Sequence, residues 1–228
     1  MLPISAPILP ADKVIVALQR KGAEALYHAD TVRTSISFLK AGGLLSRERG
    51  EKVGQTEQYT DDTDKELGLW NKVFLDSLNI HTRLKRRNLY GPVAFVLDMK
   101  VLTSPAVKVI RSSAKNPSHW KKGDRISERW FTDPQDFEKR FNQGTAWEHS
   151  LILDSEAGIL PFGSYLKEII VDQPRQKMPG TEEDTFTFVK RHLAAHLGAL
   201  QVRINCLPCS YWCRCPGTYK AMVKSFPG

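Results

Sequence analysis

Two polar residues of this chain stand at the edges of short apolar segments and could act on one substrate together. His28 closes the strand-like run at 26–28, and Glu148 opens the apolar run at 150–153. Side chains at the ends of strands often line pockets. A histidine can hydrogen-bond sugar hydroxyls, and a carboxylate can stabilise the positive charge that develops on a ribose when its glycosidic bond breaks. The glutamate could also take a proton from the attacking nucleophile. Either residue alone would be read as structural, so the hypothesis of a shared site depends on the pair.

The elements that must position His28 follow from apolar spacing and turn residues. Residues 11–25 have helical spacing, and a short strand is expected at 26–28. Asp30 is expected to cap a second helix, which should stop at Gly42-Gly43, because glycine is common just beyond a helix end.

The elements around Glu148 are expected to be strands followed by a final helix. Residues 93–102 form the clearest strand of the chain, and two more are expected at 150–153 and 167–171. Asp133-Pro134 is a typical helix start, and Thr181 resembles the first residue of a capping box for a helix toward Leu200. Helices before and after a strand-rich middle predict an α+β fold with a mixed or antiparallel sheet.

Two longer motifs extend the pattern and carry a resemblance. The segments Leu26-Tyr-His-Ala-Asp-Thr-Val and Phe38-Leu-Lys-Ala-Gly-Gly-Leu-Leu-Ser, together with the strand-initial Glu148, resemble the ADP-ribosyltransferase fold. Within that fold, the chain is most similar to DarT-like transferases that modify nucleic acid and act as toxins or phage-defence effectors. The resemblance covers about residues 26–171 and implies a split mixed or antiparallel sheet with flanking helices. It divides the chain into a catalytic domain at 1–178 and a helix with a small Cys-rich basic tail at 179–228.

The resemblance also implies roles for individual residues. NAD would be the substrate, Glu148 would be the catalytic glutamate, and His28 would contact NAD. Such transferases place a basic residue near the pyrophosphate or the nicotinamide ribose, and Arg47 and Arg49 are both candidates for it. Glu156 is a rival to Glu148, ranked second because it lies beyond the strand. Three aromatic residues could stack on nicotinamide or belong to the core: Trp70, Phe74 and Tyr90.

Two loops are expected to complete such a site. Residues 46–66 are polar and are predicted to form a long loop over NAD, with Asp61, Asp62 and Asp64 solvated. The resemblance implies that the loop at 131–147, just before Glu148, would meet the acceptor of the ADP-ribose group.

The charge distribution favours a polyanionic partner. The formal net charge is +8, and no acidic residue occurs from Thr185 to Gly228, whereas that segment carries several lysines and arginines. A second basic stretch runs from Lys108 to Arg129. Basic surfaces attract nucleic acids, although they also occur on proteins that bind none. DNA and RNA are therefore both expected acceptors.

All four cysteines fall within ten residues near the end of the sequence. Cys206, Cys209, Cys213 and Cys215 have the spacing C-x2-C-x3-C-x-C. Four thiolates suit tetrahedral zinc, and His192 with His196 could replace some of them. Disulfides and free thiols are the alternatives.

The leading hypothesis is therefore an NAD-dependent ADP-ribosyltransferase acting on DNA or RNA, with an antitoxin protein as a further expected partner. The alternative is a non-catalytic nucleic-acid-binding protein with a zinc-binding Cys-rich module. A metal-dependent nuclease is weaker, because no paired carboxylates have a convincing spacing. No apolar run approaches the roughly 20 residues of a membrane span, and a cytoplasmic protein is expected.

Overall fold

A seven-stranded mixed sheet forms the centre of the protein, as seen in a computed structural model that describes residues 6–53, 61–80, 90–142, 148–174, 176–178 and 180–209. Its strand order is β5-β6-β3-β1-β4-β8-β9, and every neighbouring pair is antiparallel except β8 and β9. The α+β prediction is confirmed. The strands are β1 (Leu26–Asp30), β3 (Val73–Asp76), β4 (Val93–Leu97), β5 (Val107–Ser112), β6 (Ser150–Ser155), β8 (Leu166–Gln173) and β9 (Arg203–Pro208).

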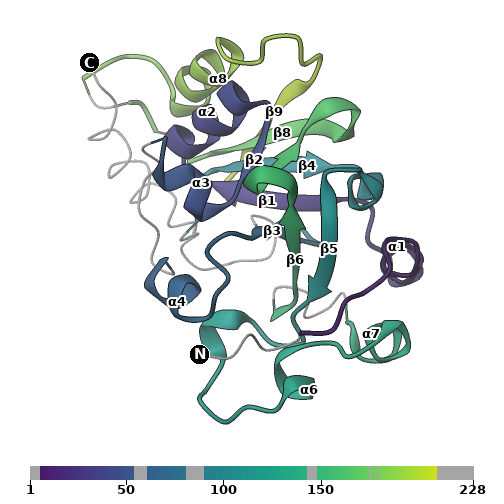
Figure 1. Cartoon of the computed structure of the whole chain (residues 1–228). Coiled ribbons are helices and arrows are strands. Elements are labelled where there is room, and N and C mark those ends of the chain that lie inside the picture. Colours follow the sequence, from purple (N-terminus) through teal and green to yellow (C-terminus); the bar gives the residue numbers. More distant parts are fainter. Residues whose placement is uncertain are drawn as a thin grey trace.

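The sheet is split between β1 and β3. These two strands share the single register pair Tyr27↔Asp76, whereas β1 pairs with β4 along its whole length and β3 does the same with β6. Figure 1 shows β5 and β6 running across the direction of β1 and β4. A separate two-stranded sheet consists of β2 (Gly43–Leu45) and β7 (Ile159–Pro161). The split leaves backbone groups of β3 facing β1 without a strand partner.

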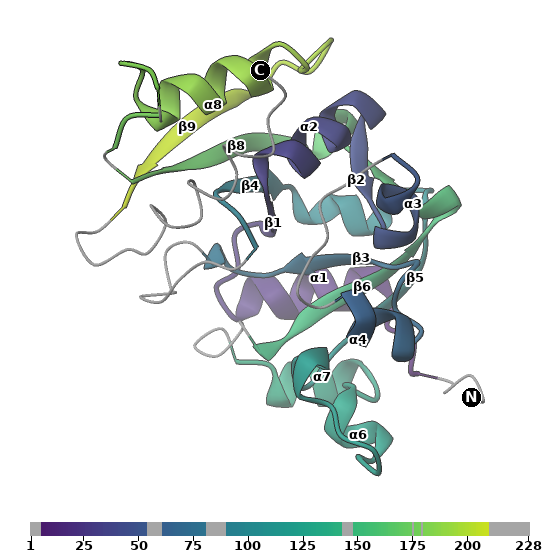
Figure 2. The same ribbon diagram turned by 90° about the vertical axis from the view of Figure 1, so that its left-hand side faces the viewer.

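Helices flank the sheet at both ends. In Figures 1 and 2, α2 and α8 lie together beside β8 and β9, and α6 and α7 lie at the opposite end of the molecule. No helix in the described part of the chain is long and apolar enough to cross a membrane. The helices are α1 (Ala11–Arg20), α2 (Val32–Ala41), α3 (Arg47–Glu51), α4 (Asp61–Glu66), α6 (Ile126–Arg129), α7 (Pro134–Arg140) and α8 (Thr185–Ala194).

The ends of α2 show which local signals decided its boundaries. Thr31, and not Asp30 as predicted, caps the helix, because its Oγ accepts a hydrogen bond from the Thr34 backbone N–H at 3.2 Å. Asp30 instead completes β1 and is 1% exposed. Gly42 ends the helix in the left-handed conformation, as predicted. A side chain on Gly43 would come within 2.4 Å of the Leu160 carbonyl oxygen, so the close pairing of β2 and β7 requires glycine there.

Three further expectations about local structure need correction. The strand expected at 93–102 ends at Leu97, because the Asp98 side chain caps the 3-10 helix η1 (Met99–Thr103) by accepting a hydrogen bond from the Lys100 N–H. The final helix α8 begins at Thr185 with Asp184 as its cap, so Thr181 lies outside it. The polar segment at 46–66 contains α3 and α4 instead of one continuous loop, because Ser46 caps α3 through the Arg49 N–H. Asp64 is buried and not solvated. In contrast, Asp133 caps α7 as its Asp-Pro start predicted.

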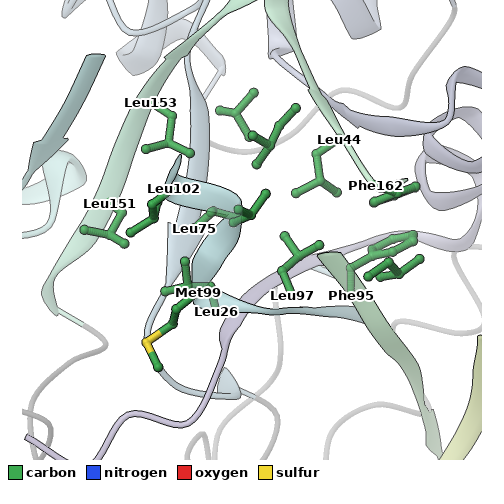
Figure 3. Close-up of a cluster of buried hydrophobic side chains, with 14 of the residues drawn as sticks. Leu26, Leu44, Leu75, Phe95, Leu97, Met99, Leu102, Leu151, Leu153 and Phe162 are labelled. Atoms are coloured by element: carbon green, nitrogen blue, oxygen red, sulfur yellow. The ribbon is translucent and has the colours of Figure 1, made fainter. Parts of the chain in front are cut away.

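The core lies between the split sheet and the β2–β7 pair. Figure 3 shows leucines from β1, β3 and β6 packing with side chains from β2, β4 and the residue after β7. Phe95 and Phe162 stack with ring centroids 5.1 Å apart, and Phe38 packs edge-on against Phe95. Full burial of each such side chain contributes about 1.5–3 kcal/mol. This packing fixes α2 and the split in the sheet relative to each other.

Candidate functional site

His28 lies at the split in the sheet and bridges its two halves. Its Nδ1 is 2.8 Å from the Phe74 carbonyl oxygen, which faces β1 where the strand pairing has ended. A carbonyl can only accept, so Nδ1 must carry the proton. The ring also contacts Phe38 edge-on at 5.3 Å. The imidazole is therefore held in one orientation and one tautomer.

The other ring nitrogen of His28 has no hydrogen-bond partner among the described residues. Nε2 is buried, and its nearest charged neighbour is Asp30 Oδ2 at 3.8 Å. Since Nδ1 carries the proton, Nε2 of the neutral ring is an acceptor. A buried polar atom without a partner is costly, so this acceptor is suited to a hydroxyl group of a bound ligand.

One row of residues across the sheet connects β1 to the start of β6. Tyr27 pairs with Asp76, and Asp76 pairs with Ser150. The Ser150 hydroxyl donates a hydrogen bond to Asp76 Oδ1 at 3.2 Å. His28 follows Tyr27 by one residue and Glu148 precedes Ser150 by two. The two residues predicted to share a site therefore flank the same end of β3, with two strand spacings of about 4.8 Å each between them across the sheet and a further offset along the strands.

The residue after Glu148 anchors the beginning of β6. His149 is buried, and its ring lies against Phe131 and Phe141 with centroids 5.2 and 5.5 Å away. Burial lowers the pKa of His149, which keeps the ring neutral near pH 7. Glu148 itself is partly buried. The aromatic contacts thus fix the backbone from which the Glu148 side chain extends.

Asp76 is the titratable residue that the sequence reasoning missed. Burial raises the pKa of its carboxyl to about 6, and the electrostatic interaction with His28 and the Ser150 hydrogen bond lower it by lesser amounts. Tyr90 lies nearby, and desolvation followed by the negative charges of Asp76 and Asp64 raises the pKa of its phenol. An aspartate that ends the apolar run at 73–75 was the available signal, but a single carboxylate after a strand is common.

The two arginines predicted to contact NAD lie at the other end of β3. Arg47 begins α3, and its guanidinium carbon is 5.8 Å from the centre of the Trp70 ring. The Lys65 ammonium is 4.2 Å from the same ring. Arg49 is exposed and contributes its backbone N–H to the Ser46 cap. Because β3 is about 13 Å long, the structure does not bring these arginines to the row that contains Asp76.

The rival carboxylate Glu156 also lies away from that row. It follows the distal end of β6, is exposed, and forms an ion pair with Lys108 at 3.1 Å. Of the two glutamates, Glu148 is the one at the His28 end of the sheet.

The described part of the cysteine cluster belongs to the sheet. Cys206 is on β9, and its Sγ lies 2.9 Å from the side-chain oxygen of Gln173, while Cys209 follows the strand. Cys213 and Cys215 lie outside the described residues. Within the described ranges, no three His, Cys, Asp or Glu side chains are grouped to hold a metal ion, and this includes His192 and His196 with the first two cysteines.

Comparisons with known proteins give one set of similar structures. No family model and no curated protein matches the sequence. The structure is similar to DarT from Thermus sp. 2.9. The complex of that protein with ADP-ribosylated ssDNA has a TM-score of 0.48 at 11% identity, covering 81% of this chain and 94% of that one. Its complex with NAD+ has a TM-score of 0.46 at 11% identity, covering 82% and 96%.

Proposed function

We propose that this protein is an NAD-dependent ADP-ribosyltransferase that modifies a nucleic acid. The observation that carries the proposal is the position of His28 and Glu148, which lie on either side of the same end of β3. The motifs at 26–32 and 38–46, which resemble this class of enzyme, supply the chemistry to assign to that pair.

His28 is proposed to bind a ribose of NAD. Its buried Nε2 lacks a hydrogen-bond partner among the described residues, and a ribose hydroxyl would provide the missing donor. The fixed tautomer means that no rearrangement of the ring is needed on binding. Arg47, together with Lys65 beside Trp70, is the first candidate for a contact with the pyrophosphate. Arg49 is the second candidate, since its side chain is exposed.

Glu148 is proposed to be the catalytic residue. The bond between nicotinamide N1 and ribose C1′ breaks, and nicotinamide leaves with the bonding electron pair. The resulting positive charge, shared by C1′ and the ring oxygen, is stabilised by the Glu148 carboxylate. An acceptor nitrogen or oxygen then attacks C1′ and forms the new bond, while Glu148 takes the proton that the acceptor loses. No metal is needed for this sequence of bond changes.

A nucleic-acid acceptor is proposed on the basis of charge. The chain has a net charge of +8. The segment between β5 and α7 contains three exposed basic residues, Lys121, Lys122 and Arg125. Single-stranded DNA and RNA are both within the proposal. A toxin or defence role, with an antitoxin as partner, follows from the resemblance and predicts growth arrest on expression that Glu148→Gln relieves.

The direct test is transfer of label from NAD labelled in its adenylate phosphate. Purified protein is incubated with separate pools of random single-stranded DNA, random RNA and total protein. Label should enter a nucleic-acid pool, and Glu148→Gln should reduce transfer at least a hundredfold. Glu156→Gln is the matched control, because it changes an exposed glutamate at the other end of β6 and should retain activity within about twofold.

Two outcomes would contradict the proposal. Absence of transfer to any pool by the wild-type protein would exclude the activity. Full activity of Glu148→Gln, with loss of activity in Glu156→Gln, would show that Glu156, and not Glu148, is the catalytic glutamate.

Zinc binding by the four cysteines is a separate proposal that rests on their spacing. Cys206 lies on β9 and Cys209 follows that strand, where a metal would join the edge of the sheet to residues further along the chain. One equivalent of zinc in purified protein, lost in Cys209→Ser, is expected. A metal-free protein with four titratable thiols would exclude it.

A further inference from the structure

Asp76 lies between His28 and the start of β6, and no lysine or arginine among the described residues neutralises its carboxylate. None of the ion pairs among the described residues includes Asp76, and no lysine or arginine affects the pKa of its carboxyl. Its one side-chain hydrogen bond comes from the Ser150 hydroxyl. A desolvated carboxylate without a cation is costly in its ionised form. Such groups are more frequent at functional sites than elsewhere.

Ser150 connects this carboxylate to Glu148. The backbone of Ser150 is already fixed, because its N–H donates to Ser113 Oγ at 2.9 Å and its carbonyl accepts from the Ser113 N–H at 2.9 Å. The hydroxyl is the remaining group, and it points across the strand pair to Asp76. Ser150 is the first residue of β6, so this hydrogen bond holds β6 to β3 next to Glu148.

We propose that Asp76 is a positioning residue, whose ionised carboxylate accepts the Ser150 hydroxyl and thereby holds Glu148 in place relative to His28. The inference rests on the proposed function, in which Glu148 is catalytic. A charged acceptor binds a hydroxyl about twice as strongly as a neutral one. Protonation would weaken this contact and would also remove the negative charge near His28.

The groups that face Asp76 come from three elements. His28 of β1 and Ser150 of β6 lower the pKa of Asp76, and the charges of Asp76 and of Asp64 in α4 raise the pKa of Tyr90 in the segment before β4. The Tyr90 phenol stays neutral near pH 7, because its pKa is raised from 10. In this group, Asp76 has a pKa of about 6 and would change charge between pH 5 and pH 7.

The test is the dependence of kcat and of the KM for NAD on pH, using labelled NAD and random single-stranded oligonucleotides. Wild-type kcat should fall about tenfold between pH 7.5 and pH 5, as expected for one ionisation near pH 6. Asp76→Asn should be independent of pH over this range and stay near the low-pH wild-type kcat. KM for NAD should change by less than about threefold, because Asp76 acts through Glu148.

Two further variants separate positioning from a general effect on folding. Ser150→Ala should lower kcat at pH 7.5. The double variant of Asp76→Asn and Ser150→Ala should have a kcat no lower than that of the more severe single variant, because both substitutions disrupt the same hydrogen bond. Asp154→Asn is the matched control on the same strand pair and should keep the wild-type pH profile.

The possible results distinguish the two proposals. A wild-type protein without transferase activity would overturn the proposed function, and the role of Asp76 with it. An active wild type whose Asp76→Asn variant keeps either its pH dependence or its full kcat would overturn the role of Asp76 alone. Additive losses in the double variant would also overturn it.

Discussion

The two ends of the β3–β6 strand pair carry carboxylates in opposite electrostatic surroundings. At one end, Asp154 lies between two cations, with Lys72 Nζ at 2.8 Å and Arg111 at 3.2 Å. At the other end, Asp76 accepts a hydrogen bond from Ser150 and has no lysine or arginine partner among the described residues, so burial raises its pKa to about 6 although His28 and Ser150 lower it. The first arrangement joins three neighbouring strands, and the second costs stability near the residues proposed to act on NAD. Two aspartates on adjacent strands of one sheet thus have different roles because of their neighbours.

The largest expected effect is a gain of stability in Asp76→Asn. The pKa of Asp76 is higher in the folded protein, about 6, than its ordinary value of 3.8. Its contribution to stability is therefore present below pH 3.8 and is lost as the pH rises through 6. At 1.36 kcal/mol per pKa unit, the ionised carboxylate costs about 3 kcal/mol at pH 7.5. Urea unfolding should show the variant more stable by up to that amount at pH 7.5, and by less at pH 5.

An Asp76→Asn variant that is less stable than wild type at both pH values would mean that Asp76 is a structural residue like Asp154.

Asp154→Ala is expected to lower the free energy of unfolding, whereas Asp76→Asn is expected to raise it. Removing this carboxylate leaves Lys72 and Arg111 without their shared counterion in a partly buried position. The loss in the free energy of unfolding should be about 2 kcal/mol, below the value for a fully buried pair because solvent reaches all three side chains. Urea unfolding at pH 7.5 measures it, and an unchanged midpoint would contradict the assigned role.

Lys72→Met should have a smaller effect than Asp154→Ala. Arg111 still neutralises Asp154, and the methionine retains most of the apolar stem. A loss of about 1 kcal/mol is expected from the same unfolding measurement. A loss larger than that of Asp154→Ala would show that Lys72 has a further partner.

The smallest effect is expected for Glu156→Gln. Its ion pair with Lys108 is exposed, with the two side chains 67% and 55% accessible. Exposed pairs contribute about 0–1 kcal/mol, so the melting temperature should move by no more than a degree or two. A clear destabilisation would show that this end of β6 depends on the pair.

Some of the candidate site could be predicted from the sequence. His28 and Glu148 were singled out because each stands at the edge of an apolar segment, and the structure places both at one end of β3. Asp76 was missed, because nothing in the run Val73-Phe-Leu-Asp shows that this carboxylate is buried without a lysine or arginine partner among the described residues. Its surroundings come from residues 48 positions before it and 74 positions after it in the sequence.

Arg47 and Arg49 illustrate a second limit. Their place just after the motif at 38–46 made them candidates, and the structure adds that a hydrogen bond from the Glu48 N–H to the Trp70 carbonyl holds α3 at the start of β3. Sequence proximity to a motif does not determine which end of a neighbouring strand a helix will contact.

The sequence by itself determined the local elements: a helix ending at Gly42, a helix starting at Asp133-Pro134, the presence of the apolar strands though not the end of the one at 93–97, and the basic composition. Caps, turns and apolar spacing involve residues within one or two turns of each other, so they can be read directly. The tertiary structure alone decided that β3 lies between β1 and β6, that the sheet splits beside His28, and that Asp76 is buried without a lysine or arginine partner among the described residues. Those features depend on pairings between distant segments, and the free energy of a buried charge is set by whichever groups the fold places around it.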